Sequence, residues 1–246
     1  MKKKKKIYVL LLAAVMLFAL TACSSTNTAS KADSTVTPQS SSMPESTEIP
    51  DKAQETTPSE FMDTSLPSES GDGNILIAYF SRAGENHNVG VIEKGNTEII
   101  AEMIAQQTGG DLFHIETVTP YPENYRECTN VAQQELRNNA RPELTATVDN
   151  FDGYDVVFLG YPNWWGDMPM AVYTFMESYD FSGKTIVPFA THEGSGLAST
   201  ESSIARICSG AKVLDGLAVR GSVAQNSQEK AKESVVNWLR EAGFTD

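Results

Sequence analysis

A short run of apolar residues, Ile75 to Phe80 within the segment NILIAYFS, shows no alternation with polar side chains. Such a run predicts a strand buried on both faces, as found at the centre of a parallel sheet. Residues 82–94, which follow, are polar and contain glycine, and they predict a long loop. A helical spacing of apolar residues begins near Thr97, and either Thr97 or Asn96 could cap that helix. A buried strand, a polar loop and a helix N-terminus favour an anion, and we expect a phosphate there.

The rest of the domain alternates strand and helix patterns. Further strands are predicted at residues 111–118, 154–160, 185–190 and 211–219, and helices at 97–108, 125–139, 170–179, 199–208 and 227–242. Pro188 is unusual inside a strand and requires a bulge or a missing ladder bond. Strict alternation predicts an α/β fold: a doubly wound, three-layer structure around a five-stranded parallel sheet of order 2-1-3-4-5. Ligands of such sheets bind beyond the carboxyl ends of the strands, at the switch point between strands one and three.

The N-terminal residues have the pattern of a targeting signal. Lys2 to Lys6 are followed by an apolar stretch, residues 7–20, that is shorter than the ~20 residues a spanning helix needs. The sequence LTAC, ending at Cys23, resembles the bacterial lipoprotein signal, in which cleavage precedes an acylated cysteine. The alternative is an ordinary secretory signal with an incidental cysteine. We therefore expect a signal peptide at residues 1–22, lipidation of Cys23 and a location outside the cytoplasm, anchored to the cell membrane.

A polar segment separates this signal from the apolar patterns. Residues 24–70 include 25 Ser, Thr or Pro residues among 47, and hardly any of the others are apolar. Such a segment cannot bury enough apolar surface to offset the conformational entropy lost on folding. We expect a disordered tether at residues 23–72 that begins with the acylated cysteine, and one folded domain at residues 73–246.

Charge and cysteine content exclude several classes of function. The net charge is −13, and removal of the signal would make it −18, which argues against nucleic-acid binding and is compatible with a redox protein that docks to a basic partner. Three scattered histidines and the absence of CxxC predict no metal site. Cys128 and Cys208 fall on separate predicted helices, so we expect no disulfide between them.

Two of the three loops at the predicted carboxyl ends carry distinctive chemistry. The first offers hydroxyls, backbone N–H groups and Arg82 to a phosphate, although Ser81 and Thr97 could instead be plain helix caps. The second places Trp164 and Trp165 between Pro162 and Gly166, a pattern that favours stacking on an aromatic ligand. The alternatives for this pair are a docking patch for a partner, or one indole folded onto a helix.

The third loop, residues 191–196, is suited to the edge of a flat ligand. Gly194 and Gly196 would let the backbone approach closely. Hydrogen-bonding groups are supplied by Thr191, His192, Glu193 and Ser195. A lone histidine is more often exposed or packed than catalytic, so no catalytic residue is predicted.

The segments IAYFSRAGEN, GNTE, GYPNWWG and THEGSG together make residues 74–244 resemble the flavodoxin-like FMN-binding family, in a bacterial branch with an enlarged first loop. Flavodoxin is itself the usual example of the switch-point rule. The resemblance implies FMN, with the phosphate near Ser81, Arg82, Ala83, Asn96 and Thr97. It implies that the flavin ring lies between two loops, whose residues are Pro162, Asn163, Trp164, Trp165, Gly166, Thr191, His192, Glu193, Gly194 and Gly196.

Two departures from the family pattern affect the predicted site. The insertion at residues 82–94 leaves the individual phosphate ligands open, and no aromatic residue stands in residues 191–196. One flavin face would then be open, or covered only by His192 and backbone. An open face suits exchange with a small substrate, whereas a closed face suits a one-electron carrier.

The resemblance implies a flavoprotein that acts in electron transfer or as an FMN-dependent oxidoreductase of the NAD(P)H/quinone type. Its partner would be a redox protein or a small electron donor or acceptor. Two alternatives stay open: a non-catalytic module that binds another planar or phosphorylated ligand, and an interaction protein that docks through its tryptophan pair.

Overall fold

The computed structural model describes residues 74–246. The predicted signal peptide at residues 1–22, the lipidation site at Cys23 and the tether at residues 23–72 lie outside the described residues. No helix in the described part is long and apolar enough to cross a membrane.

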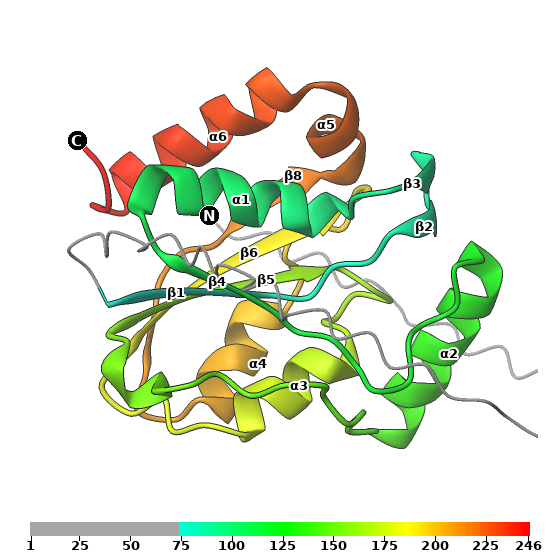
Figure 1. Cartoon of the computed structure of the whole chain (residues 1–246), viewed down its shortest axis with the longest axis horizontal. Helices are drawn as coiled ribbons and strands as arrows, with labels where there is room; N and C mark the ends of the chain where they lie inside the picture. The colour runs from blue at the N-terminus through cyan, green and yellow to red at the C-terminus, as the bar shows by residue number, and fades with distance from the viewer. Residues whose placement is uncertain (1–73) are drawn as a thin grey trace, which may run out of the picture. The chain divides into compact units, whose positions relative to one another are not determined.

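The described chain folds into a parallel sheet covered on both faces by helices (Figure 1). Its elements are β1 (Ile75–Tyr79), β2 (Gly84–Asn86), β3 (Gly90–Ile92), α1 (Asn96–Thr108), β4 (Asp111–His114), α2 (Tyr125–Asn138), a 3-10 turn (Phe151–Gly153), β5 (Val156–Pro162), α3 (Met170–Glu177), β6 (Thr185–His192), α4 (Thr200–Ile207), β7 (Lys212–Val213), β8 (Leu217–Arg220), α5 (Gly221–Asn226) and α6 (Gln228–Glu241). The sheet order is β4-β1-β5-β6-β7, with β8 also paired to β6. This arrangement confirms the predicted 2-1-3-4-5 topology.

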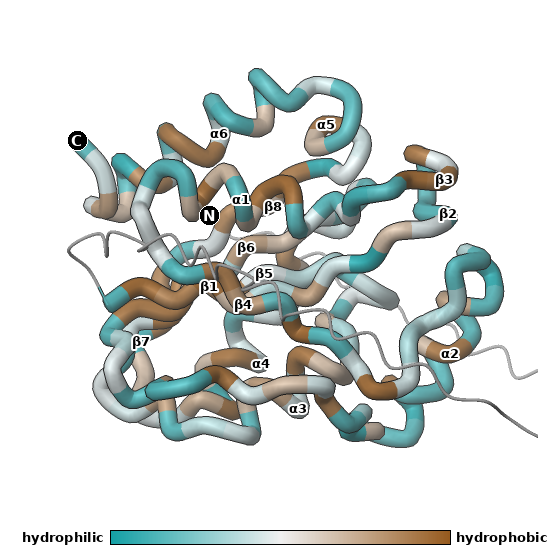
Figure 2. The backbone as a smooth tube through the Cα atoms, in the orientation of Figure 1, coloured by the Kyte–Doolittle hydropathy of each residue, from teal (hydrophilic) through white to brown (hydrophobic). Residues whose placement is uncertain are grey.

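Strand β1 is buried on both sides, as its uniform apolar run predicted. Ile77 and Tyr79 pack into a cluster with α1, α5 and α6. Leu76, Ala78 and Phe80 pack into the opposite cluster with α3 and α4. Figure 2 shows the hydrophobic residues of β1 between helices whose outer faces are mostly hydrophilic. The layers therefore follow from two apolar helix faces meeting one apolar sheet.

The predicted fifth strand at residues 211–219 is wrong in detail, because two short strands, β7 and β8, take its place along β6. Ile186 accepts a hydrogen bond from the N–H of Leu214, so its backbone faces β7. Pro188, two residues further, faces the same side and cannot donate. The ladder is interrupted there, whereas the register between β5 and β6 continues through Pro188. Pro188 is therefore accommodated where a ladder hydrogen bond is missing, which is one of the two possibilities that the sequence left open.

Two further predictions need correction. Residues 82–94 are not only a loop, since β2 and β3 pair as an antiparallel hairpin with Gly84 at φ +84° and Asn88 at φ +62°. Helix α5 was not predicted, because it is only six residues long and lacks an apolar period. Cys128 and Cys208 are free and buried, so no disulfide joins these two residues.

Candidate functional site

A cavity of about 460 Å³ lies where the carboxyl ends of β1, β5 and β6 meet. Its volume is within the range of ~300–1,000 Å³ that is typical of small-molecule sites. The sequence-predicted residues on its wall are Arg82, Asn96, Pro162, Asn163, Trp164, Trp165, Thr191, His192, Glu193 and Gly194. The predicted residues that do not line it are Ser81, Ala83, Thr97, Gly166 and Gly196. The three predicted loops therefore converge on one site.

The first turn of α1 forms the anion-attracting end of this site. The hydroxyl oxygen of Ser81 accepts a hydrogen bond from the N–H of Glu98 at 3.1 Å, and Gly95 O accepts one from Ile99 at 3.3 Å. The N–H groups of Asn96 and Thr97 have no acceptor among residues 74–246. They stand at the positive end of the helix dipole, where an anion is stabilised.

Neither Asn96 nor Thr97 caps α1, contrary to the sequence prediction. The N-cap residue is Gly95, which has no side chain to donate or accept. A Cβ atom on Gly95 would lie 2.1 Å from the Ser81 hydroxyl oxygen and 2.9 Å from the Arg82 nitrogen. The turn after β1 and the start of α1 can therefore pack this closely only with glycine at this position.

Arg82, predicted as a phosphate ligand, lines the cavity but bonds mainly to the protein itself. Its Nη1 donates to the carbonyl oxygens of Ala83 at 2.8 Å and Pro122 at 3.2 Å, and its Nη2 donates to that of Glu85. Its Nε is buried and meets no acceptor within the described chain. The guanidinium group thus ties the hairpin to the segment before α2.

The second loop is a tight turn that presents its two indoles differently. Trp164 packs edge-on against Phe80, with ring centroids 5.4 Å apart, and against Tyr121 at 5.2 Å. Trp165 is 56% exposed at φ +57°, and its Nε1 donates to Thr129 O on α2 at 3.1 Å. Trp164 is therefore the fixed aromatic wall, and Trp165 is the indole that folds onto a helix.

Asn163 ties the second loop to the third. Its backbone N–H donates to Thr191 O at 2.8 Å, and its Nδ2 donates to Gly196 O at 2.8 Å. Its Oδ1 accepts from the N–H of Gly166 at 3.1 Å. Asn163 and Gly196 thus help to shape the loops, whether or not they touch a ligand.

The third loop is held by polar bonds inside the protein. The buried hydroxyls of Thr97 and Thr191 lie 2.8 Å apart. Glu193 accepts from the N–H of Ser222 at 2.7 Å, which fastens the loop to the start of α5. Several backbone groups of this loop are also bonded within the protein: the N–H of Gly194 to His192, and the carbonyl oxygens of Thr191 and Gly196 to Asn163.

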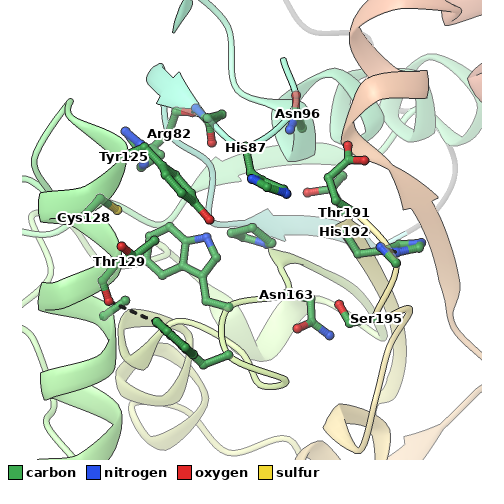
Figure 3. Close-up of a pocket in the computed structure, with 17 residues that line it drawn as sticks. Arg82, His87, Asn96, Tyr125, Cys128, Thr129, Asn163, Thr191, His192 and Ser195 are labelled. Atoms are coloured by element: carbon green, nitrogen blue, oxygen red, sulfur yellow. Dashed lines mark hydrogen bonds between the residues drawn. The ribbon is translucent and has the colours of Figure 1, made fainter. Parts of the chain in front are cut away.

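His192 faces the cavity as a neutral imidazole. Its Nδ1 accepts a hydrogen bond from the N–H of Gly194 at 2.8 Å, so the ring proton lies on Nε2. Burial, and secondarily the charge of Arg220, lower the pKa of His192 below its ordinary value of 6.5. Figure 3 shows this ring at one side of the cavity and His87 at another. His192 can therefore donate, but not carry a stable positive charge.

Part of the wall was not predicted from the sequence. The hairpin supplies Asn86 and His87, and α2 supplies Tyr125, Cys128, Thr129 and Ala132. The one sequence signal for these residues was the unusual length of the segment between Ser81 and Gly95. Their approach to the cavity depends on the path of the chain before α2, which no local pattern specifies.

The comparisons agree with this geometry. A candidate flavoprotein from Bacteroides eggerthii shares 29% identity, with a TM-score of 0.53 over 68% of this chain and 96% of its own. A second one, from Bacteroides uniformis, shares 25% identity, with a TM-score of 0.52 over 68% and 98%. A flavoprotein from Lactobacillus acidophilus, solved in complex with FMN, shares 21% identity and a TM-score of 0.47 over 60% and 93%.

No curated protein is similar enough to the chain to count as a match. The sequence model described as Flavodoxin matches residues 74–240, which is well over half of the chain. The chain therefore belongs to the flavodoxin family.

Proposed function

We propose that this protein binds FMN in the cavity and acts as an FMN-dependent electron-transfer protein or oxidoreductase. The observation that carries the proposal is one cavity with an anion-attracting end, at Asn96 in the first turn of α1, and an aromatic wall, at Trp164. Family membership and the FMN held by the Lactobacillus acidophilus flavoprotein support the same ligand.

The donor set fits a flat ring that bears a phosphate tail. The free N–H groups of α1 suit the phosphate, and the close packing at Gly95 keeps side chains out of their way. Gly194 has φ +144°, and a Cβ there would meet nothing within 4 Å, so the loop backbone is open to a ring edge. His192 adds a neutral N–H donor. These residues would bind and orient FMN without closing the cavity.

Bound FMN would supply hydride and electron-transfer chemistry, and the protein would set its orientation and access. The third loop has no aromatic residue, so the site depends on Trp164 for its ring contact. The electron donor and acceptor would be a redox protein or a small molecule such as NAD(P)H or a quinone. Steady-state NAD(P)H oxidation with quinones, compared with electron exchange with a protein such as cytochrome c, separates an enzyme from a carrier.

We also propose that the protein is a lipoprotein held outside the cytoplasm. The cationic start, the apolar stretch and Cys23 support this location, and residues 24–70 would space the domain from the membrane. Labelling of bacterial cells with radioactive palmitate tests it. The full chain should incorporate label and a Cys23→Ser variant should not; equal labelling would refute the anchor.

The decisive experiment for FMN is a visible spectrum of the purified protein, followed by mass spectrometry of what heat releases. We expect a yellow protein, or a colourless one that becomes yellow with added FMN. Trp164→Ala should weaken FMN binding by about tenfold, since stacking and the order of the loop are lost together. Trp165→Ala is the matched control and should change affinity less, because this indole rests on α2.

A colourless protein that FMN cannot reconstitute would overturn the proposal. Binding of another phosphorylated or planar molecule in the same cavity would then favour a non-catalytic module. Equal effects of the two tryptophan substitutions would refute the assignment of Trp164 as the ring contact.

A further inference from the structure

The cavity extends beyond the three loops that would hold the cofactor. On one side its wall is built by the tip of the β2–β3 hairpin, with His87, and by α2, with Tyr125, Cys128 and Thr129. We call this part the hairpin–helix compartment. No residue of it belongs to the phosphate turn or to the third loop, so its side chains are available to a second molecule.

Aromatic surfaces dominate the compartment. The rings of His87 and Tyr125 stack, with centroids 5.6 Å apart and planes inclined by 25°. Tyr125 begins α2 and is 37% exposed, so its ring is accessible to a ligand. Figure 3 shows both rings directed into the cavity from two different elements. The bond from Trp165 Nε1 to Thr129 O fixes a further indole at the same edge.

Hydrogen bonds within the protein hold this wall together. The carboxylate of Glu85, on β2, accepts hydrogen bonds from Asn124 Nδ2 at 2.9 Å and from the N–H of Tyr125 at 3.0 Å. The N–H of Glu85 donates to Glu123 O at 2.9 Å. The guanidinium group of Arg82 bonds to both sides of the same junction. The hairpin and the start of α2 are therefore held together, which lowers the entropic cost of binding between them.

Within residues 74–246, the wall of the compartment carries no carboxylate, and the Arg82 guanidinium beside Cys128 is bonded to backbone carbonyl oxygens. Among the described residues on the cavity wall, Glu193 is the only carboxylate, and its oxygens bond to Ser222 and Asn88. Burial raises the pKa of Cys128, which keeps its thiol neutral. The imidazole of His87 and the phenol of Tyr125 supply donors at the rim. Flat walls, donors and no free carboxylate match a planar neutral molecule that carries acceptor oxygens.

We propose that the hairpin–helix compartment binds a planar, uncharged carbonyl compound of the quinone class next to the cofactor site. The inference rests on the proposed function, since FMN would occupy the other part of the cavity. The third loop has no aromatic residue to cover the flavin. The aromatic rings of α2 and the hairpin would instead contact the quinone that lies beside the flavin.

Calorimetric titration of duroquinone into the FMN-loaded full chain, purified in detergent, tests this site. Duroquinone carries four methyl groups, so thiols do not add readily to its ring. We expect one equivalent to bind. Tyr125→Ala should weaken binding by about fivefold, whereas Tyr125→Phe, which keeps the ring but loses the phenol donor, should weaken it by about two- to threefold.

His87→Ala, on the exposed hairpin, should also weaken binding by about fivefold and serves as a second variant should Tyr125→Ala fold poorly. Val91→Ala is its matched control, because Val91 lies on the same hairpin, is 82% exposed and does not line this cavity. The affinity for FMN, followed by flavin fluorescence, should stay within about twofold in all four variants.

Three outcomes are separable. Absence of duroquinone binding, or unchanged binding in Tyr125→Ala and His87→Ala, refutes the compartment while FMN binding still supports the proposed function. Weaker FMN binding with unchanged duroquinone binding refutes it too, and assigns Tyr125 to the cofactor. Failure of the wild type to bind FMN refutes the proposed function; duroquinone titrated into that protein then tests the compartment alone.

Discussion

Replacing Arg82 with lysine separates two roles that this side chain could have. The guanidinium group donates to carbonyl oxygens of Ala83, Pro122 and Glu123 at 2.8, 3.2 and 3.3 Å, and also to that of Glu85. These acceptors lie on both sides of the junction between the hairpin and α2. Lysine keeps the positive charge, but its compact ammonium group cannot reproduce the planar fork.

The magnitude follows from the bonds that lysine loses. A hydrogen bond to a charged group contributes about 1.5–3 kcal/mol, and the partial exposure of Arg82 favours the low end. The lysine ammonium group can keep most of these contacts but loses at least one hydrogen bond completely. The free energy of unfolding should therefore fall by about 2 kcal/mol. For a domain of this size we expect the melting temperature to fall by about 6 °C. The urea midpoint should fall by about 1 M.

Urea unfolding without FMN, followed by far-UV circular dichroism, is the assay. Arg137→Lys is the matched control, because Arg137 bonds only to Gln133 on its own helix and should cost less than about 0.5 kcal/mol. Equal midpoints for Arg82→Lys and the wild type would refute the structural role. Unchanged stability with tenfold weaker FMN binding would instead make Arg82 a phosphate ligand, as the sequence predicted.

Three more predictions address the turn, the titration and the thiols. Gly95→Ala should lower the free energy of unfolding by about 1–3 kcal/mol, because its Cβ would lie 2.1 Å from the Ser81 hydroxyl oxygen; thermal denaturation measures this, and an unchanged melting temperature would contradict it. The pKa of His192 is lowered by burial, so its contribution to stability is complete above its ordinary pKa of 6.5 and is lost as the pH falls towards the folded value. His192→Gln should therefore lose less stability than the wild type between pH 7.5 and pH 5, and parallel losses in urea unfolding would count against the assignment. Burial raises the pKa of Cys208 to about 12 and also raises that of Cys128, so iodoacetamide at pH 8 should label both only after unfolding, as mass spectrometry of their peptides would show.

The sheet was the part most accessible to sequence analysis. Strands such as Ile75–Tyr79 and Val156–Pro162 are continuous apolar runs, and burial on both faces of a parallel sheet produces that pattern locally. Alternation with helices then left few topologies, and the observed order is the predicted one. The ends of strands were less accessible. The edge strand beside β6 is divided into β7 and β8 because Pro188 interrupts the ladder between strands that are distant in the sequence.

The hairpin–helix side of the cavity could not be predicted in the same way. Its residues, such as His87 and Tyr125, are polar or amphipathic and lie on elements with no buried face towards the sheet. Their positions depend on bonds across about 40 residues, from Arg82 to Pro122 and from Glu85 to Tyr125. Each of these bonds joins a side chain to a backbone group. Because every residue has a backbone, the sequence does not indicate which residue is the backbone partner.

The three loops that the sequence predicted meet at one cavity, and the sequence named both hydroxyls and backbone N–H groups as candidate contacts for a ligand. The Ser81 hydroxyl accepts from Glu98, Thr97 pairs with Thr191, and the side chains of Asn96 and Glu193 bond to residues of α5. These polar side chains hold the loops in place, and the groups that remain free at the α1 end are backbone N–H groups. Substitutions among them should therefore alter ligand affinity by moving a loop, together with a loss of stability. Close approach of backbone, as at Gly95, should matter more for the phosphate than any single hydroxyl.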